Sequence, residues 1–565
     1  MKNRFTILFA TLVLGASISN AQTYYPGGVS GSGTNELWFD ANSLGYTTTG
    51  ELVTVFTDRS GNGNDAAQAD PSAQPIYYKN NPIFNGQASV YFDGVNDVLK
   101  TPPVANLNTN TQTIFCVASI YKPTSTSGII FRLSYTSGGG GTIPSNYFIS
   151  NYYTTTQYVM QLRNADASNI LSTFPKPDYI SLSAMLWNGS TSFKSYNNGS
   201  LLTSVAGSSA SPLGNLGMSL GGNFTGALMP FKGWLAETIV YTTPLNSAEK
   251  NIVENYLAAK YYLTISNDLF AYNTGYLSGH YFDLIGIGQE SDGSNSSAIG
   301  ENLSINTPSS LGNGDYLLVA HDNAGYSPNL VDVPLSSGER YSQIWRADLT
   351  GTPGTVTIEF DVTTNSLGAD SNAYELLVDA DGVFGVGATS YSGSYSGGMV
   401  TFTAVALSDG NYFTLYNNST TPQTITSTGT TTDWHTTTTW DCACVPSFNS
   451  DVTILAAHTV DVNGQDANSR NLTIEGVLSF SGSDTLFLNG NLINNGTFTA
   501  GTGVVKSKMV SAQSFSGTSN LNFYDLFLDN PTTVTNSGTI AISNQLNILQ
   551  GVLVTGGSVR LLSTV

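Results

Sequence analysis

Charged residues are scarce in this chain, and positively charged ones are the scarcest. Asp, Glu, Lys and Arg make up 10% of the 565 residues, with 19 Lys and Arg against 39 Asp and Glu, a net charge of −20. Such a surface repels nucleic acid and anionic membranes. It favours solubility and attracts divalent cations. We therefore expect no nucleic-acid partner.

Cysteine is also sparse, and the 3 Cys exclude a disulfide scaffold. Cys116 lies in the apolar run 113–118 and is expected to be a small core residue. Cys442 and Cys444 are separated by one residue. A bridge between them would be strained, although an oxidising compartment could permit it. We expect a structural role for this pair, bridged or free.

The residue patterns of common catalytic centres are missing. None of the 4 His forms H-E-x-x-H, and no G-x-S-x-G motif occurs. His435 and His458 flank the cysteine pair, but their spacing differs from that of structural zinc sites. Glu237 is the one acid of its expected strand and is interpreted as a partnered or rim carboxylate. Sugar-cleaving enzymes of concanavalin-like fold need alternating carboxylates on one strand, which we do not find, so we expect no enzyme.

The one long apolar run lies at the N-terminus. Lys2 and Arg4 precede the run 5–14, and Ser19 and Ala21 fit the small-x-small cleavage pattern. Residues 1–21 are therefore predicted to be a signal peptide. An uncleaved anchor is the alternative, but the run is short of the ~20 residues that span a bilayer. The chain is expected to be secreted or displayed on the outer cell surface, with no membrane span after cleavage.

Short segments rich in Val, Ile, Thr, Tyr and Phe, separated by Gly, Asn and Asp turns, predict an all-β chain. Residues 22–263 are predicted to form a jelly roll that ends in a helix. Asn246 and Glu249 fit a capping box, and Val253, Tyr256, Leu257 and Lys260 share one helix face.

The loop 58–65, with the sequence DRSGNGND, resembles the D-x-S-G-N-G-N loop of laminin-G-like, concanavalin-like jelly rolls. Residues 90–97 resemble the strand and turn that follow it. The segments 234–241 and 247–262 resemble the closing strand and helix in surface proteins of gliding, type IX-secreting bacteria. Oxygen-bearing side chains gather in this loop and predict a calcium site, with an Asx-rich turn as the alternative: Asp58, Asn62, Asn64 and Asp65.

Residues 264–416 are predicted to be a second β-sandwich, similar to a domain without assigned activity in the same protein class. A Thr-rich linker is expected at 417–432. In residues 433–565 the pattern L-x-I followed by G-x-L occurs at 472–478 and again at 546–553, and short strands at frequent intervals predict β-solenoid-like coils. This region resembles the N-L-x-I and G-x-L arrays of the same surface proteins. A third sandwich is the alternative. The strand-like run before Val565 lacks a polar cap, so a truncated repeat region is expected.

Two functions fit these features. The first is a secreted or cell-surface adhesion protein whose jelly roll binds a glycan or a protein. The second is a non-catalytic accessory part of a larger secreted polysaccharide-degrading enzyme. Calcium is the one cofactor that the sequence suggests.

Overall fold

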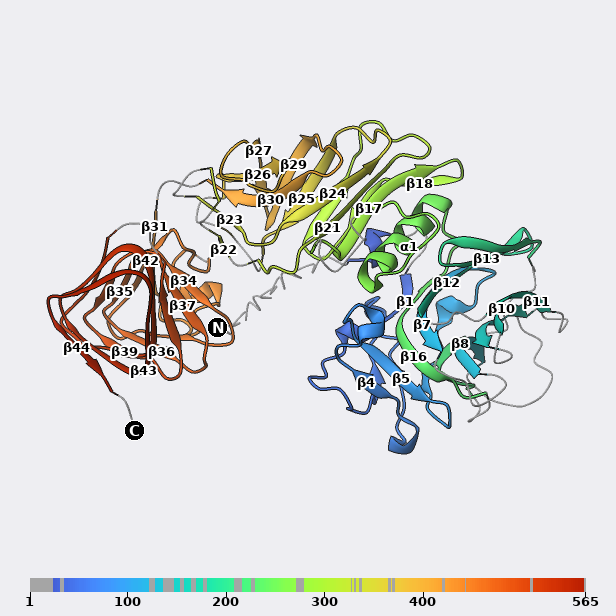
Figure 1. Cartoon of the computed structure of the whole chain (residues 1–565), viewed down its shortest axis with the longest axis horizontal. Helices are drawn as coiled ribbons and strands as arrows, with labels where there is room; N and C mark the ends of the chain where they lie inside the picture. The colour runs from blue at the N-terminus through green and yellow to red at the C-terminus, as the bar shows by residue number, and fades with distance from the viewer. Residues whose placement is uncertain are drawn as a thin grey trace, which may run out of the picture.

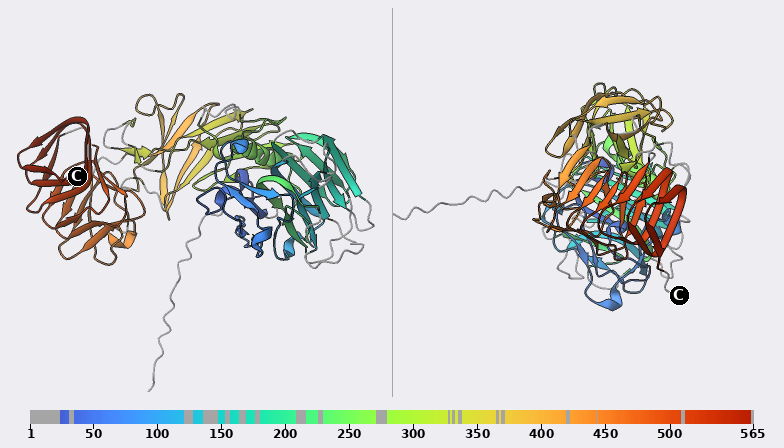
Figure 2. Two further views of the ribbon diagram at one scale, coloured as in Figure 1. Left: turned by 60° about the horizontal axis from the view of Figure 1, so that its bottom comes forward. Right: turned by 90° about the vertical axis from the view of Figure 1, so that its left-hand side faces the viewer.

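In the computed structural model, three β regions follow one another along an elongated molecule (Figure 1). A jelly roll lies at one end, a second sandwich in the middle and a solenoid at the other end, as the turned views also show (Figure 2). The structure describes residues 24–562 except 31–34, 121–127, 136–146, 153–156, 164–168, 176–179, 208–215, 225–228, 271–278, 327, 330–331, 335–337, 364–366, 368–370, 419–421, 443 and 509–511. The predicted signal peptide 1–21 lies outside this range.

The jelly roll consists of two eight-stranded antiparallel sheets. The first, which we call the helix-side sheet, has the order β14 (Ser200–Val205), β13 (Ser192–Asn197), β12 (Ile180–Asn188), β7 (Thr111–Ile120), β16 (Lys232–Tyr241), β5 (Ser89–Asp93), β4 (Ile76–Tyr78), with β1 (Asn35–Asp40) also paired to β16. The second, the far sheet, has the order β11 (Asn169–Pro175), β10 (Gln157–Arg163), β9 (Tyr147–Tyr152), β8 (Gly128–Tyr135), β15 (Leu216–Leu220), β6 (Leu99–Lys100), β3 (Ala66–Ala67), β2 (Val55–Phe56).

The central strands of the helix-side sheet are apolar on both faces. One face of β7 and β16 contributes Cys116 and Leu235 to the core between the sheets. The opposite face contributes Phe115 and Ile239 to a second core against the helix α1 (Ser247–Tyr261). The sequence of a strand that is covered on both sides is a continuous apolar run and does not alternate between apolar and polar residues. The position of Cys116 confirms the core role predicted for it.

The helix α1 begins with the predicted capping box. The Asn246 side chain accepts a hydrogen bond from the Glu249 backbone N–H, and the Glu249 carboxylate accepts one from the Asn246 N–H, both at 2.9 Å. Nearly all of the helix is buried, because the jelly roll covers one side and the second sandwich the other (Figure 1). The helix thus joins the two domains.

The segment 24–30, here called the N-terminal strap, is inserted at the same junction. The Tyr25 N–H donates to the Ile299 carbonyl at 3.2 Å, and the Val29 carbonyl accepts from the Tyr241 hydroxyl at 2.9 Å. A Cβ at Gly28 would lie 2.8 Å from Ala298 Cβ and 3.0 Å from Ile285 Cβ. The strap therefore packs against both sandwiches without space for a side chain at this point.

The second domain is a sandwich of a nine-stranded and a five-stranded antiparallel sheet, which confirms the predicted fold. The larger sheet contains β17 (Phe282–Glu290), β18 (Gly293–Asn295), β21 (Tyr316–His321), β22 (Pro328–Asn329), β23 (Glu339–Tyr341), β24 (Trp345–Thr350), β26 (Tyr374–Asp379), β27 (Thr389–Ser392) and β30 (Tyr412–Asn417). The smaller contains β19 (Ser297–Ile299), β20 (Leu303–Asn306), β25 (Val356–Asp361), β28 (Ser394–Ser396) and β29 (Met399–Val405).

The C-terminal region is a β-solenoid of parallel strands and not a third sandwich. Thr453 pairs with Thr473, and Thr473 with Ile493, each 20 residues on. Its first column of strands is β31 (Gln423–Thr426), β32 (Ser450–Ile454), β35 (Leu472–Ile474), β38 (Leu492–Asn494) and β41 (Gln513–Ser516). The second column is β33 (Thr459–Val462), β36 (Val477–Phe480) and β39 (Thr497–Thr499). The third is β34 (Ala467–Ser469), β37 (Thr485–Leu488) and β40 (Val504–Ser507).

Three long or terminal strands complete the solenoid: β42 (Leu521–Asn536), β43 (Thr539–Thr555) and β44 (Ser558–Leu561). The predicted linker 417–432 differs from the structure, because β31 is already the first strand of the solenoid. Thr-rich segments are compatible with strands as well as linkers, since Thr is a β-former. In the described residues, no helix is long and apolar enough to cross a membrane.

Candidate functional site

The predicted calcium loop is held together by its own hydrogen bonds. The carboxylate of Asp58 accepts from the backbone N–H groups of Trp38, Ser60 and Asn64 at 2.9–3.1 Å. Asp65 accepts from the Asp58 N–H at 2.8 Å. These oxygens therefore serve as backbone acceptors.

The two amides of the loop point to strand β1. The Asn62 side-chain amide donates to the carbonyls of Asn35 and Glu36, both at 3.1 Å, and Asn64 Nδ2 donates to the Glu36 carboxylate at 3.4 Å. Among the described residues, no group of three or more His, Cys, Asp or Glu is arranged to hold a metal ion. The geometry favours the Asx-rich turn over calcium, which stays a prediction.

Glu237 proves to be the centre of a buried network, so its interpretation as a partnered carboxylate is confirmed. Its Oε1 accepts from Trp38 Nε1 at 2.7 Å and from the Tyr256 hydroxyl at 3.0 Å. Its Oε2 accepts from Lys260 Nζ and from the Tyr261 hydroxyl, both at 2.7 Å. Burial raises the pKa of Glu237 although Lys260 opposes the shift.

Asp40 adds a second buried carboxylate to this network. Its Oδ2 lies 2.6 Å from Arg59 Nη1 and 2.9 Å from Lys260 Nζ. Burial would raise the pKa of Asp40, but the charges of Lys260 and Arg59 outweigh it and lower the pKa. Arg59 also stacks over the Trp38 ring, with 4.5 Å from Cζ to the centroid. Two acids and two bases thus lie together inside the junction, where their charges offset one another.

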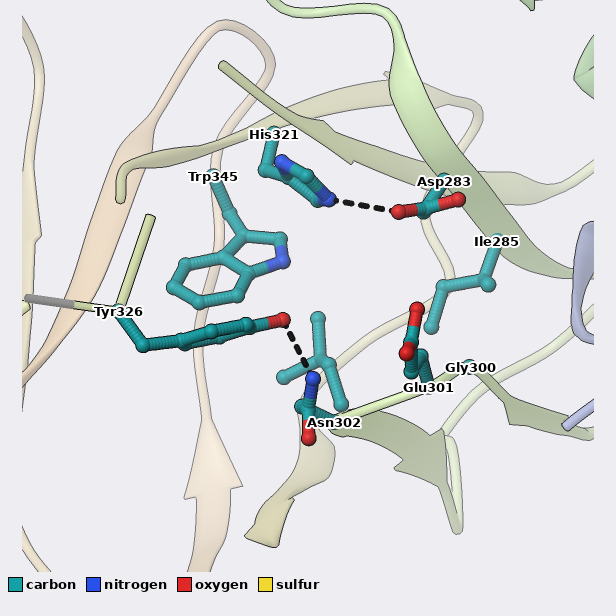
Figure 3. Close-up of a pocket in the computed structure, with 9 residues that line it drawn as sticks. Asp283, Ile285, Gly300, Glu301, Asn302, His321, Tyr326 and Trp345 are labelled. Carbon is teal, nitrogen blue, oxygen red and sulfur yellow. Dashed lines mark hydrogen bonds and ion pairs between the residues drawn. The ribbon is translucent and has the colours of Figure 1, made fainter. Parts of the chain in front are cut away.

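A small hollow opens beside this junction, at a bulge in the second sandwich (Figure 3). Asp283 has a φ of +47° where the register of β17 against β21 shifts. Its Oδ2 lies 3.0 Å from His321 Nε2, and the Asp322 carbonyl lies 2.5 Å from His321 Nδ1. Each ring nitrogen of His321 thus faces an oxygen atom that accepts hydrogen bonds.

The remaining walls of the hollow are aromatic and polar. Asn302 Nδ2 donates to the Tyr326 hydroxyl at 2.6 Å, and the Trp345 ring closes one side (Figure 3). Burial and the charge of Asp283 raise the pKa of Glu301. The open volume is about 10 Å³, which is the space of about one water molecule. The hollow is therefore too small for a sugar ring.

The sequence His-Asp-Asn at 321–323, directly after a strand, predicts a solvated turn, and this prediction is wrong. Its side chain is 12% exposed and lies between the rings of Phe282 and Trp345, at 6.0 and 5.8 Å. The sequence His-Asp-Asn gives no signal for this, because Phe282 and Trp345 lie far along the chain. The hollow was missed for the same reason.

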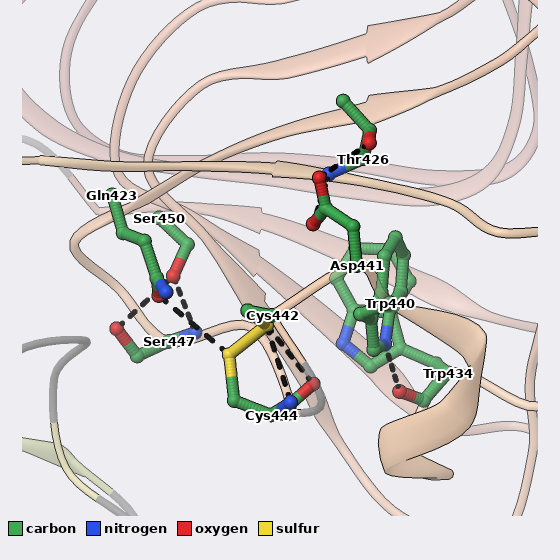
Figure 4. Close-up of a disulfide and its surroundings, with 9 residues drawn as sticks. All are labelled: Gln423, Thr426, Trp434, Trp440, Asp441, Cys442, Cys444, Ser447 and Ser450. Carbon is green, nitrogen blue, oxygen red and sulfur yellow. Dashed lines mark hydrogen bonds between the residues drawn. A yellow bond between two sulfur atoms is a disulfide. The ribbon is translucent and has the colours of Figure 1, made fainter.

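Cys442 and Cys444 form a disulfide at the start of the solenoid (Figure 4). Both pack against the solenoid core, next to the buried rings of Trp434 and Trp440, whose centroids are 5.0 Å apart. The Trp440 indole donates to the Trp434 carbonyl at 2.8 Å. The expected structural role of the pair is therefore confirmed: the segment covers the first coil.

Four further polar side chains, two acids and two histidines, lie apart from these networks. Asp379 and Asp381 bond to backbone N–H groups of their own turn. His458 Nδ1 lies 2.8 Å from the Ser427 hydroxyl, and His435 Nε2 lies 3.1 Å from the Asp466 carbonyl. Because both sulfur atoms of the pair are in the disulfide, neither is a thiolate that could bind zinc beside these histidines.

One face of the far sheet is turned away from the core between the sheets; it is exposed at β11 and buried at β8 and β15. Paired residues follow one another across the far sheet from Lys100 to Ser219, Arg132 and, beyond β9, Gln161 and Leu171. Leu171 is 53% exposed, while Arg132 is buried and donates to the Asn223 side-chain oxygen at 2.8 Å. In the described residues, the core that joins the jelly roll to the second domain contains no side chain of the far sheet.

Comparisons with known proteins give a partial picture. No curated protein matches the chain. A family model described as a domain of unknown function (DUF8202) matches residues 249–411. That range starts inside α1 and ends before β30, so it groups the helix with the second sandwich.

Similar solved structures include domain 4 of an extracellular GH43 arabinanase from Geobacillus stearothermophilus in complex with arabinotriose, at 13% identity and a TM-score of 0.27, covering 39% of this chain and 98% of that one. Another is the carbohydrate-binding module CBM40 of the Ruminococcus gnavus IT-sialidase bound to α2,3-sialyllactose, at 16% identity and a TM-score of 0.23, covering 29% and 94%. A third is the SAP-like pentraxin from Limulus polyphemus, at 14% and 0.24, covering 30% and 82%. At these TM-scores they settle neither ligand nor activity, and the resemblance to type IX-secreted surface proteins stays a prediction.

Proposed function

We propose that the chain is an exported, non-catalytic binding protein whose jelly roll recognises a glycan or a protein outside the cell. The observation that carries this proposal is the unequal use of the two sheets. The helix-side sheet is covered by α1 and the second domain, whereas the far sheet lies on the side of the jelly roll away from them (Figure 1). The second sandwich and the solenoid then act as spacer and stalk.

The chemistry of the far sheet suits recognition. Gln161 and Thr173 point outward beside the exposed Leu171, so that hydrogen-bonding groups and an apolar side chain lie next to one another. Lys100, half-buried on the same face, adds one positive charge in a chain that has few. Binding surfaces combine an apolar area with a few polar groups that orient the ligand.

A glycan array and a pulldown from cell-surface extracts, both with the full chain, test the proposal. We expect binding to at least one class of glycan or surface protein, weakened tenfold or more by Thr173→Trp or by Lys100→Glu. Lys79→Glu makes the same charge change at an exposed site after β4 and should leave binding unchanged. Absence of binding to every glycan and extract would overturn the proposal.

Two separate measurements address the remaining parts. Incubation with a panel of polysaccharides should release no new reducing ends, and hydrolysis of any of them would contradict a non-catalytic role. Expression in the source cells followed by N-terminal sequencing of the exported chain should give Gln22 as the first residue; retention of the intact N-terminus inside the cell would contradict export.

A further inference from the structure

The second column of the solenoid is interrupted between the third and the fourth strand position. Strands β33, β36 and β39 pair in parallel and form a separate three-stranded sheet. Farther on, Leu521 of β42 pairs with Ile540 of β43, and Ile540 with Val559 of β44. Among the described residues, β39 and the start of β42 are not paired. The other two columns continue through this level.

The turn that precedes β42 is unusually long. Two residues precede β36, β39, β43 and β44, whereas four residues, 517–520, precede β42. The long turn is fixed on the coil before it: the Ser519 N–H donates to the Asn494 carbonyl at 2.9 Å and the Thr518 N–H to Asn495 Oδ1 at 3.1 Å. A long turn alone does not prevent pairing, since four residues also precede β33, which pairs with β36. The interruption is thus a specific local structure.

A shallow hollow of about 360 Å³ lies at this interruption. Its rim carries the exposed side chains of Thr497, Thr499, Asn522 and Ser543. Beneath them, the rings of Phe498 and Phe523 are in contact, with centroids 5.4 Å apart. Small-ligand sites have volumes of roughly 300–1,000 Å³. The hollow falls within that range, unlike the hollow beside Asp283.

The lining identifies the ligand class. Hydroxyl and amide groups surround an apolar side formed by Ala541 and Leu562, and the described residues that line the hollow include no charged side chain. Hydroxyl and amide groups both donate and accept hydrogen bonds, as sugar hydroxyls do. The unpaired edge of β39 adds backbone groups with the same capacity. In a chain of net charge −20, an uncharged site favours a neutral ligand over an anion.

An extended peptide fits less well. A strand inserted between β39 and β42 would need two strand spacings, about 9.6 Å, between them. Cα atoms of the two strands approach within 8 Å. The space is therefore too narrow for an added strand, although a ring resting in the hollow from outside needs no such separation.

We propose that this hollow is a second binding site, which takes a sugar residue of a neutral oligosaccharide. It is independent of the jelly-roll function, because it lies in another region of the chain. Its consequence is that the solenoid does more than hold the jelly roll at a distance.

Affinity electrophoresis of the full chain in gels containing xylan, mannan, laminarin or arabinan tests the proposal. We expect retardation by at least one of these neutral polysaccharides. Ser543→Trp, which fills the hollow, should weaken that retardation tenfold or more. Thr473→Trp places the same side chain on the outward side of β35, outside the hollow, and should have no effect.

A second variant controls for the possibility that Ser543→Trp misfolds. Deleting Thr518 and Ser519 shortens the turn to two residues and should abolish binding while the circular dichroism spectrum stays unchanged. The proposal is overturned if no neutral polysaccharide retards the chain, if retardation survives both hollow variants, or if a peptide library binds this site in place of sugars. Loss of retardation through Thr173→Trp alone would assign the binding to the jelly roll and equally overturn it.

Discussion

The jelly roll and the second sandwich, here called the sandwich pair, are held together in a different way from the solenoid. In the jelly roll, Asn35 pairs with Tyr241, so a sheet closes only when distant segments meet. In the solenoid, partners such as Thr473 and Ile493 lie one coil apart. The sandwich pair also buries the charges of Asp40 and Glu237, whereas the buried polar side chains in the described part of the solenoid, such as Gln513 and Asn530, are uncharged. Long-range closure with buried charges makes one unit sensitive to single substitutions, and local stacking limits damage to neighbouring coils.

The largest effect should follow from removing Lys260. In Lys260→Met, Asp40 and Glu237 lose a shared cation inside the junction, and breaking a buried ion pair costs about 3–5 kcal/mol. We expect the unfolding transition of the sandwich pair to move to lower denaturant and that of the solenoid to stay. Tyrosine and tryptophan fluorescence in urea, with Lys79→Met as the exposed control, measures this. Equal shifts of both transitions would remove the contrast between the regions.

The next effect concerns the N-terminal strap. Gly28 has a φ of +74°, which favours glycine, and a side chain there meets Ala298 and Ile285. We expect Gly28→Val to cost about 1–3 kcal/mol and to loosen the contact between the sandwiches. Limited proteolysis near residues 264–280 should become faster. Gly45→Val, at a glycine with open space around it, is the control; unchanged proteolysis of the Gly28 variant would contradict a structural strap.

A smaller effect should come from the disulfide, this time in the solenoid alone. The bridge between Cys442 and Cys444 closes a loop of three residues. By lowering the entropy of the unfolded chain, a loop of this length stabilises the folded state by about 1–2 kcal/mol. We expect the double variant Cys442→Ser and Cys444→Ser to lower the solenoid transition slightly. The transition of the sandwich pair serves as internal reference. A shift in that reference would show that the two regions unfold together.

A pH effect is expected from Asp97 in the jelly roll. Burial raises the pKa of Asp97 to about 7, with the charge of Asp93 adding to the shift. The folded state thus holds the proton more tightly than the unfolded state, and this stability is lost as the pH rises through 7. We expect the Tm of the sandwich pair to fall slightly between pH 5 and pH 8, and Asp97→Asn to flatten that slope. An unchanged slope in the variant would assign the effect to other groups.

The smallest effect is expected from calcium. The oxygens of Asp58 and Asp65 already accept backbone hydrogen bonds. We therefore expect the same Tm of the sandwich pair in millimolar calcium and in EDTA. Differential scanning fluorimetry with and without the ion makes the comparison. A rise in Tm with calcium that Asp58→Asn abolishes would restore the predicted metal site.

Much of the fold could be predicted because its signals are local. Asn246 and Glu249, which indicate the start of α1, are three residues apart. Leu472 and Leu492, which pair in neighbouring coils, are 20 residues apart. The end of the predicted linker could not be placed, since β31 is recognised only by its pairing with β32, some 27 residues on. Pairing over such distances leaves no trace in the composition of either strand.

The sites were less predictable, again for a physical reason. Glu237 is recognisable in the sequence as the one acid of its strand. Its partners Trp38 and Tyr261 lie near opposite ends of the jelly-roll sequence, so the network they form with Glu237 is not. The hollow of the solenoid had a weak signal: the repeat is imperfect, and the extra residues 517–520 are where it departs from its period. This change in the period does not indicate which residues line the hollow, because the lining residues come from three successive coils.

Hydrogen exchange of the full chain, with and without its strongest ligand from the glycan array or the pulldown, tests the proposed role of the jelly roll most directly. The outward face of the far sheet is expected to be the contact surface, so amides of β10 and β11 should exchange more slowly in the complex. Slower exchange in the helix-side sheet or the second sandwich alone, with β10 and β11 unchanged, would contradict recognition by the far sheet.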